Sequence, residues 1–233
     1  MTLPPPKIEL IEGIYVVRDD LIPGGTKQRA LEQVLPTFGP GEYVYAGPVS
    51  GYAGLALAYA CRALGLDYRA TLFQAQRRVK HRRSLEALSV GATIKEIDPG
   101  YLSNVTAKAR RYCAHTGAVL CPWGLDYPAF LDALTAIAKT LPIEPTEVWT
   151  VAGSGVLSRA LQRAWPTAAF YAVNISQHRV NAGKATILNA PESFEREAVY
   201  PPPFPSCSTY DAKAWRFVYS YAKPGALFWN VAS

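Results

Sequence analysis

The sequence contains few of the residues that bind metals or cross-link chains. Its 233 residues include 3 histidines and 4 cysteines, and the cysteines form no CxxC pair. Cys113 and Cys121 are poorly spaced for zinc ligands, so we predict no metal site. Four dispersed cysteines are typical of free thiols in a reducing compartment, and we therefore expect a cytoplasmic protein.

Long hydrophobic runs and a secretory leader pattern are also lacking. No stretch approaches the roughly 18 consecutive apolar residues that a membrane-spanning helix needs. The segment 1–7 (MTLPPPK) has no basic region followed by an apolar region, so no signal peptide is expected. The sequence therefore predicts a protein that does not enter a membrane.

Charge is scarce relative to apolar content. Charged residues make up 18% of the chain and hydrophobic residues 49%, a balance that excludes an intrinsically disordered protein. A chain of this length can bury a core without disulfides, as one large domain or two small ones. The 24 Lys+Arg against 18 Asp+Glu give a net charge of +6. This excess favours an anionic partner without specifying its kind.

Apolar strands alternate with helices along the chain. Strands are predicted over residues 14–17, 41–45, 68–73, 92–97, 118–121, 147–152 and 168–173. Helices are predicted over residues 53–64, 79–90, 102–115, 128–140 and 156–164. This alternation predicts an α/β fold with mainly parallel sheets covered on both faces, and ligands bind such folds at the carboxyl ends of the strands.

A lysine follows two glycines at the predicted start of a helix, in the segment Gly24-Gly25-Thr26-Lys27. A helix N-terminus carries a positive partial charge, which disfavours a protonated amine. An unprotonated lysine amine is the form that attacks carbonyl groups. The alternative is an ordinary loop lysine in contact with solvent.

Three further segments are candidates for chemistry. Gly153-Ser154-Gly155 joins a strand to a helix, where backbone N–H groups bind anions or simply form a turn. Ser50, in a second junction, is either a helix cap or a ligand-binding hydroxyl. Tyr210 is either an acid–base group or an aromatic residue of the core.

In their order and spacing these segments resemble motifs of the fold type II pyridoxal-phosphate enzymes, the tryptophan synthase β-like group. The branch that they resemble most is that of aminocyclopropane-carboxylate deaminase and D-cysteine desulfhydrase. Lys27 falls on the lysine of that group's first motif, which forms a Schiff base with the cofactor. The other matching segments are Val17–Leu21, Gly47–Ala53, Cys121–Gly124, Gly153–Leu157, Ser208–Ala214 and Leu227–Ser233.

The resemblance implies a fold and a set of roles. It implies two small three-layer lobes, a larger cofactor-binding lobe of residues 1–40 and 118–233 and a smaller α/β lobe of residues 41–117. Lys27 would hold pyridoxal 5′-phosphate and then act as a base, Tyr210 would assist proton transfer, and Ser50 would position the substrate carboxylate. The implied cofactor-binding residues are Lys27, Gly51, Tyr52, Gly153, Ser154, Gly155, Ser158 and Val231.

The sequence departs from the family motifs at four of these contacts. The family's asparagine near the ring hydroxyl is Gly51, and the neighbouring histidine is Tyr52. The threonine of the phosphate-binding loop is Leu157, which leaves backbone donors and the hydroxyls of Ser154 or Ser158. The polar residue opposite the pyridine nitrogen is Val231, and an unpaired nitrogen weakens the ring as an electron sink.

Three functions follow as hypotheses. The first is a pyridoxal-phosphate-dependent lyase or deaminase that carries out elimination, deamination or decarboxylation at the α-carbon of an amino acid or amine, as a homodimer. The second is a related enzyme of phage-type DNA hypermodification that acts on an amino-acid-modified nucleotide. The third is a non-catalytic relative that binds a ligand or partner. The second depends on a basic cluster that would contact nucleic acid: Arg77, Arg78, Lys80, Arg82 and Arg83.

Overall fold

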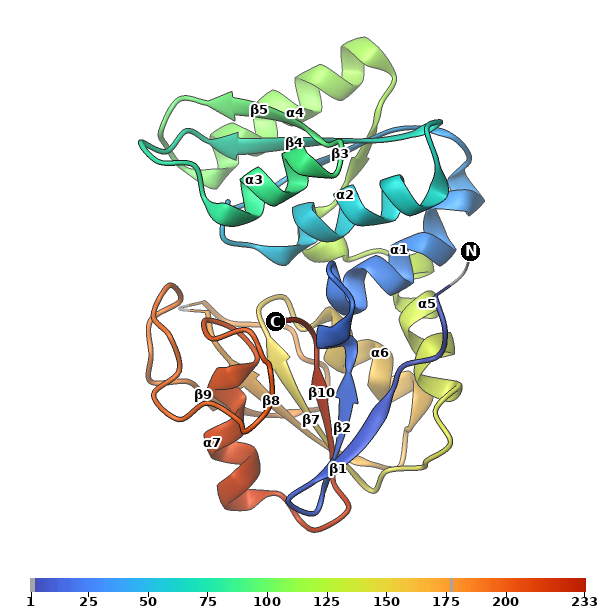
Figure 1. Cartoon of the computed structure of the whole chain (residues 1–233), viewed down its shortest axis with the longest axis vertical. Helices are drawn as coiled ribbons and strands as arrows, with labels where there is room; N and C mark the ends of the chain where they lie inside the picture. The colour runs from blue at the N-terminus through green and yellow to red at the C-terminus, as the bar shows by residue number, and fades with distance from the viewer. Residues whose placement is uncertain (1–2, 177) are drawn as a thin grey trace. The chain divides into compact units, whose positions relative to one another are not determined.

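The computed structural model describes residues 3–176 and 178–233. The chain divides into two compact units (Figure 1). Among the described residues, the first is built from Leu3 and Lys27–Tyr127, and the second from Pro4–Thr26 and Pro128–Ser233. The first unit is larger than the expected lobe of residues 41–117. Residues 1 and 2 of the expected larger lobe lie outside the described residues.

Two contacts explain why the first unit extends beyond residues 41–117. Helix α1 (Gly25–Phe38) continues into this unit, where the Tyr43 hydroxyl donates to the carbonyl of Leu35 at 3.2 Å. At the other end, strand β6 (Val119–Cys121) pairs with strand β3 (Gly41–Ala46). Both segments are therefore held by the smaller sheet, which the sequence pattern alone did not indicate.

The first unit is a parallel sheet with helices on both faces. Its strand order is β5-β4-β3-β6, and Figure 1 shows α2 and α3 on one face with α4 on the other. Val44 and Ala46 of β3 pack with Val105 of α4 in one buried cluster, as expected for alternate residues of a strand. The remaining elements are β4 (Tyr68–Ala75), β5 (Thr93–Ile97), α2 (Tyr52–Leu64), α3 (Arg82–Ser89), α4 (Leu102–Thr116) and the 3-10 turn η2 (Trp123–Leu125).

The second unit contains a six-stranded sheet in the order β1-β2-β10-β7-β8-β9. Within the described residues, β1–β2 is the one antiparallel pair of this sheet. The strands are β1 (Ile8–Ile11), β2 (Ile14–Arg18), β7 (Glu147–Ala152), β8 (Ala169–Asn174), β9 (Thr186–Asn189) and β10 (Leu227–Asn230). The helices are α5 (Pro128–Lys139), α6 (Val156–Ala164) and α7 (Ala212–Tyr221), with the 3-10 turn η1 (Asp19–Leu21).

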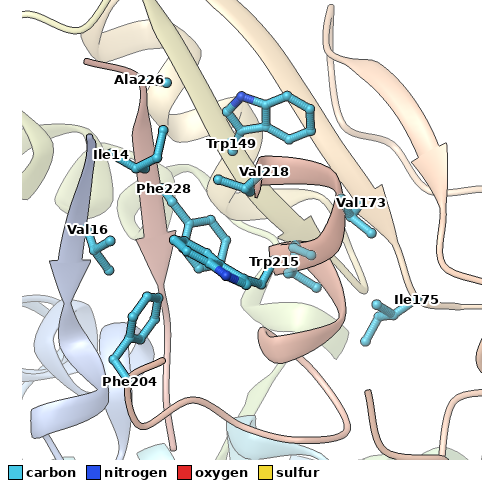
Figure 2. Close-up of a cluster of buried hydrophobic side chains, with 12 residues drawn as sticks. Ile14, Val16, Trp149, Val173, Ile175, Phe204, Trp215, Val218, Ala226 and Phe228 are labelled. Atoms are coloured by element: carbon cyan, nitrogen blue, oxygen red, sulfur yellow. The ribbon is translucent and has the colours of Figure 1, made fainter. Parts of the chain in front are cut away.

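An aromatic core holds α7 against this sheet. Figure 2 shows Trp149, Trp215 and Phe228 in the buried cluster between the helix and the strands. The ring of Phe204 meets Trp215 edge-on at 5.0 Å between ring centroids. Each large aromatic side chain removes roughly 150–250 Å² from water. The strands β7 and β10 each contribute a large aromatic residue to this core, Trp149 and Phe228.

The α/β class with mainly parallel sheets is confirmed. The expected helix over residues 79–90 starts later, at Arg82, because the His81 ring accepts the Arg83 N–H at 3.2 Å and caps the helix. The chain between β4 and His81 is a loop. In the described residues no helix has the length and apolarity needed to cross a membrane.

A buried lysine fastens a loop of the second unit to α7. Lys213 is only 1% exposed, and its ammonium donates to the carbonyls of Ser193 at 2.9 Å and Phe194 at 3.1 Å. Burial lowers the pKa of Lys213, an effect that Glu192 and Cys207 partly oppose. The lysine of the Ser208–Ala214 segment therefore has a structural partner in this unit.

Replacing Lys213 with methionine should lower the free energy of unfolding by about 1.5–3 kcal/mol, because two carbonyls lose a charged donor. The wild type should gain stability relative to this variant as the pH rises toward the ordinary lysine value of 10.5, because the unfolded chain binds the proton more tightly. Urea denaturation measures both effects. Lys139→Met, at an exposed position of α5, is the control, and an equal effect in both variants would contradict the prediction.

Candidate functional site

The turn before Lys27 is fixed to the end of strand β10. Thr26 donates its N–H to the carbonyl of Val231 at 3.0 Å. Gly25 has φ +63°, and a Cβ placed there would lie 2.1 Å from the same carbonyl oxygen. Only glycine allows this close approach. Because Lys27 is the next residue along α1 and is half-buried, its backbone position is set by this contact.

A buried polar network supports that turn. The Trp229 indole N–H donates to the Thr26 hydroxyl at 2.9 Å and to an Asp19 carboxylate oxygen at 3.2 Å. Arg18 binds both oxygens of Asp20, at 2.8 Å and 2.7 Å. Both aspartates are buried, and buried carboxylates need such partners. The motif Val17–Leu21 therefore has a structural role: through Asp19 and Trp229 it supports the turn that precedes Lys27.

The loop Gly153–Gly155 has the form of an anion-binding site. It leads from β7 to the first turn of α6, where backbone N–H groups lack partners within the helix. Gly155 has φ +80°, and a Cβ there would lie 2.1 Å from the carbonyl oxygen of Asn181. The backbone conformation thus requires glycine, and a phosphate group fits the chemistry of these donors.

Tyr210 lies against this loop. The N–H of Gly153 donates to the Tyr210 hydroxyl at 3.2 Å, and a Cβ at residue 153 would lie 3.2 Å from the same oxygen. Residues 153 and 210 come from distant parts of the sequence, so the fold brings two of the predicted site residues together. One contact of the Tyr210 hydroxyl is therefore with the anion-binding loop.

Ser158, another predicted cofactor-binding residue, makes hydrogen bonds within the second unit. Its hydroxyl donates to the carbonyl of Ala182 at 3.1 Å and accepts the amide N–H of Gln162 at 3.0 Å. The side chain is 1% exposed. Ser158 therefore fastens α6 to the loop after β8, so its hydroxyl already has two partners within the protein.

Val231 follows β10 directly, and its apolar side chain is buried. Its carbonyl accepts the Thr26 N–H. The next residue, Ala232, is bound to the Tyr210 segment: Cys207 donates its N–H to the Ala232 carbonyl at 2.8 Å, and Ala232 donates its N–H to Asp211 at 3.2 Å. The end of β10 therefore holds both the turn before Lys27 and the segment that carries Tyr210.

In the first unit, the junction between β3 and α2 is a tight turn. Gly51 donates its N–H to the carbonyl of Pro48 at 3.0 Å. Gly51, and not Ser50, occupies the N-cap position of α2, so the capping alternative for Ser50 is not observed. The Ser50 carbonyl accepts a hydrogen bond from the Arg83 guanidinium, which also lies 3.8 Å from the centroid of the Tyr52 ring. Ser50 and Tyr52 are therefore held by one arginine.

Because of this position, Arg83 differs in exposure from the other members of the predicted basic cluster. Arg83 is buried, whereas Arg77, Arg78 and Arg82 are exposed. Lys80 pairs with Glu96 at 2.7 Å, which offsets its charge. The five cations do not share one surface, because Arg83 is directed to the turn at Ser50 and Tyr52.

A polar cavity of about 590 Å³ lies in the second unit at the ends of β8 and β9. The Asn174 amide, at the end of β8, donates to the side chain of Asn189 at 3.1 Å, at the end of β9. The lining residues also include His178, Arg179 and Glu192. Sequence reasoning missed this cavity, because its residues form no recognisable motif. Its place at the carboxyl ends of parallel strands is the usual one for ligands in such sheets.

At the level of sequence, no protein-family model and no curated protein matches the chain. Solved structures do match. An ACC deaminase homologue has a TM-score of 0.83 at 14% identity, covering 99% of this chain and 90% of that one. Escherichia coli diaminopropionate ammonia lyase in apo form has a TM-score of 0.71 at 13% identity, with 99% and 83% covered. A hydrogen sulfide-producing enzyme of Fusobacterium nucleatum has a TM-score of 0.67 at 13% identity, with 99% and 94% covered.

These comparisons confirm the fold that the motifs indicated. The chain has the fold of the fold type II pyridoxal-phosphate enzymes, and its structural neighbours include lyases and deaminases. Identities of 11–17% establish the fold alone. The activity of this chain must therefore be argued from its own residues.

Proposed function

We propose that this protein is a pyridoxal-phosphate-dependent enzyme that acts at the α-carbon of an amino acid or amine. The observation that carries the proposal is an arrangement in the second unit. The adjacent parallel strands β7 and β10 end at the anion-binding loop Gly153–Gly155 and at Val231, which anchors the turn before Lys27. A phosphate-binding loop and a lysine amine are the two kinds of group that hold this cofactor.

The residues present fit the phosphate and aldehyde ends of the cofactor. The N–H groups that follow Gly153, in the rest of the loop and the first turn of α6, would hold the phosphate, because the N–H of Gly153 itself donates to the Tyr210 hydroxyl. Lys27 would hold the aldehyde carbon covalently through Nζ. The bound cofactor supplies an electron sink that stabilises negative charge at the substrate α-carbon. Lys27 Nζ would also be the general base that accepts the α-proton of the substrate. In the first unit, the hydroxyl of Ser50 is proposed to bind the substrate carboxylate.

Val231 sets a limit on the chemistry. Its side chain has no polar atom, and its carbonyl accepts the N–H of Thr26. Residue 231 thus offers no carboxylate or hydroxyl to the pyridine nitrogen. Reactions that depend on a fully protonated ring are therefore disfavoured. Elimination, deamination and decarboxylation are the outcomes to compare.

Titration of the purified protein with pyridoxal phosphate should produce an absorption band at roughly 410–420 nm, the range expected for a cofactor linked to lysine. The loaded protein should then release ammonia or carbon dioxide from one member of a panel of small amino acids that includes D-cysteine, L-serine and aminocyclopropane carboxylate. A protein that takes up no cofactor would refute the proposal and favour a non-catalytic relative of the fold.

A further inference from the structure

The net charge of the chain is concentrated in the first unit. Residues 27–127 contain 13 Lys+Arg and 7 Asp+Glu, so this part carries a net charge of +6. The rest of the chain contains 11 Lys+Arg and 11 Asp+Glu and is neutral. Such an asymmetry between two parts of a chain indicates contact with a polyanion, provided that the cations are exposed and share a surface.

Helix α4 supplies one side of such a surface and contains no Asp or Glu. Exposed side chains recur along it at intervals of three or four residues, which places them on one side of the helix: Asn104, Lys108, Arg111 and His115. Within the described residues, neither Lys108 nor Arg111 forms an ion pair. Their charges are therefore not offset by carboxylates of this chain.

Two cations of the sheet lie beside the same helix, next to Tyr112. The Lys95 ammonium, from β5, lies 4.7 Å from the centroid of the Tyr112 ring. The hydrogen bond that Tyr112 donates to Glu42 raises the pKa of Tyr112, and the nearby charge of Arg69 on β4 partly opposes this rise. In the part of the chain that the structure describes, Lys95 and Arg69 are also outside any ion pair. The basic surface of α4 thus comprises Arg69, Lys95, Lys108 and Arg111.

We propose that the basic surface of α4 binds single-stranded nucleic acid. Proteins bind single strands with cations that follow the phosphate backbone and with exposed aromatic rings on which bases stack. Tyr101 directly precedes α4 and is 84% exposed. It lies seven residues before Lys108, so it continues the spacing of the exposed side chains. From Tyr101 to His115 the helix rises roughly 20 Å, which is long enough to contact several nucleotides. This surface is independent of the proposed cofactor site.

Two other polyanions fit this surface less well. Helices that lie on an anionic membrane insert an exposed apolar side, whereas the apolar side of α4 is buried, with Val105 2% exposed and Ala109 0%. In a nucleic-acid duplex the bases are stacked on one another, so they do not offer a free face to Tyr101. The exposed aromatic ring beside the cations therefore favours a single strand.

The test measures binding of a labelled single-stranded DNA of about 20 nucleotides by fluorescence anisotropy, between about 50 and 200 mM salt. Four phosphate contacts predict that affinity falls with salt with a logarithmic slope of about −3, at roughly 0.7 per contact. Lys108→Gln with Arg111→Gln should reduce the size of this slope by about 1.4 and weaken binding at least about tenfold at the lower salt. Lys139→Gln with Lys223→Gln removes the same charge from exposed positions of the second unit and should change neither.

Tyr101→Ala tests the stacking contact separately. The Tyr101 side chain makes no capping hydrogen bond, so α4 should remain intact in this variant. Affinity for the single strand should fall about tenfold with an unchanged salt slope, because stacking on a base releases no counterions.

Several results would overturn this assignment. They are a wild type that does not bind the single strand at about 50 mM salt, a second-unit control that loses as much affinity as the α4 variant, and a Tyr101→Ala variant with full affinity. Tighter binding to a duplex of the same sequence, or to vesicles that contain phosphatidylserine, would also overturn it. None of these measurements involves pyridoxal phosphate, so the proposed function stands or falls separately on its own absorption titration.

Discussion

Replacement of Lys27 with alanine should abolish the absorption band that pyridoxal phosphate produces and should lower turnover by at least about 10²–10⁴-fold. The first effect follows because no amine remains at this position to hold the aldehyde. The second follows because the general base is lost, and a positioned base contributes a factor of this size. Absorption spectra and product release, measured at saturating cofactor, record the two effects.

Folding should be preserved in this variant, because the contacts that fix the turn belong to its neighbours. Gly25 and Thr26 pack against Val231 through their backbones, and alanine is a good helix former in the first turn of α1. Lys27→Arg is the matched control, since it retains the positive charge but does not form the linkage to an aldehyde. Both variants should be colourless with unchanged thermal unfolding. A persistent band in Lys27→Ala would assign the reactive amine to a different lysine.

Local patterns were sufficient to predict β7 and α6 beside the candidate site, but not β10 or α7. The anion-binding loop was visible because a buried apolar run ends in Gly-Ser-Gly before a helix, and β7 and α6 lie where that pattern placed them. The two glycines before Lys27 likewise indicated a turn. In each case the signal is a backbone requirement, which a short segment expresses through glycine and apolar spacing.

Contacts between distant segments were not predictable from such patterns. The hydrogen bond between Gly153 and Tyr210 joins residues 57 apart. Arg83 lies 33 residues after Ser50, and its place in a run of cations suggested a solvent-exposed surface. Its burial depends on how α3 packs beside α2, and no local feature of the run records that packing. The contact of Ser158 was not predictable for the same reason, because its partner Ala182 belongs to the loop after β8.

Gly155→Ala should destabilise the protein by about 2–5 kcal/mol. Two effects add at this position. The backbone is left-handed, with φ +80°, which costs an alanine about 1–2 kcal/mol. The new Cβ would also lie 2.1 Å from the Asn181 carbonyl oxygen, and relieving such a contact in a packed region costs about 1–3 kcal/mol more. Urea denaturation measures the sum.

Gly225→Ala separates these two effects. Gly225 has φ +83°, and a Cβ there would meet no atom within 4 Å. This variant should therefore lose only the conformational part, about 1–2 kcal/mol. The difference between the variants reports how rigidly the Asn181 backbone holds the anion-binding loop. If the two variants had the same free energy of unfolding, the loop would shift readily to make room for the new Cβ. A phosphate would then have to fix the loop conformation when it binds. A large difference means that the N–H groups are fixed in place before the phosphate arrives, as the proposed function requires.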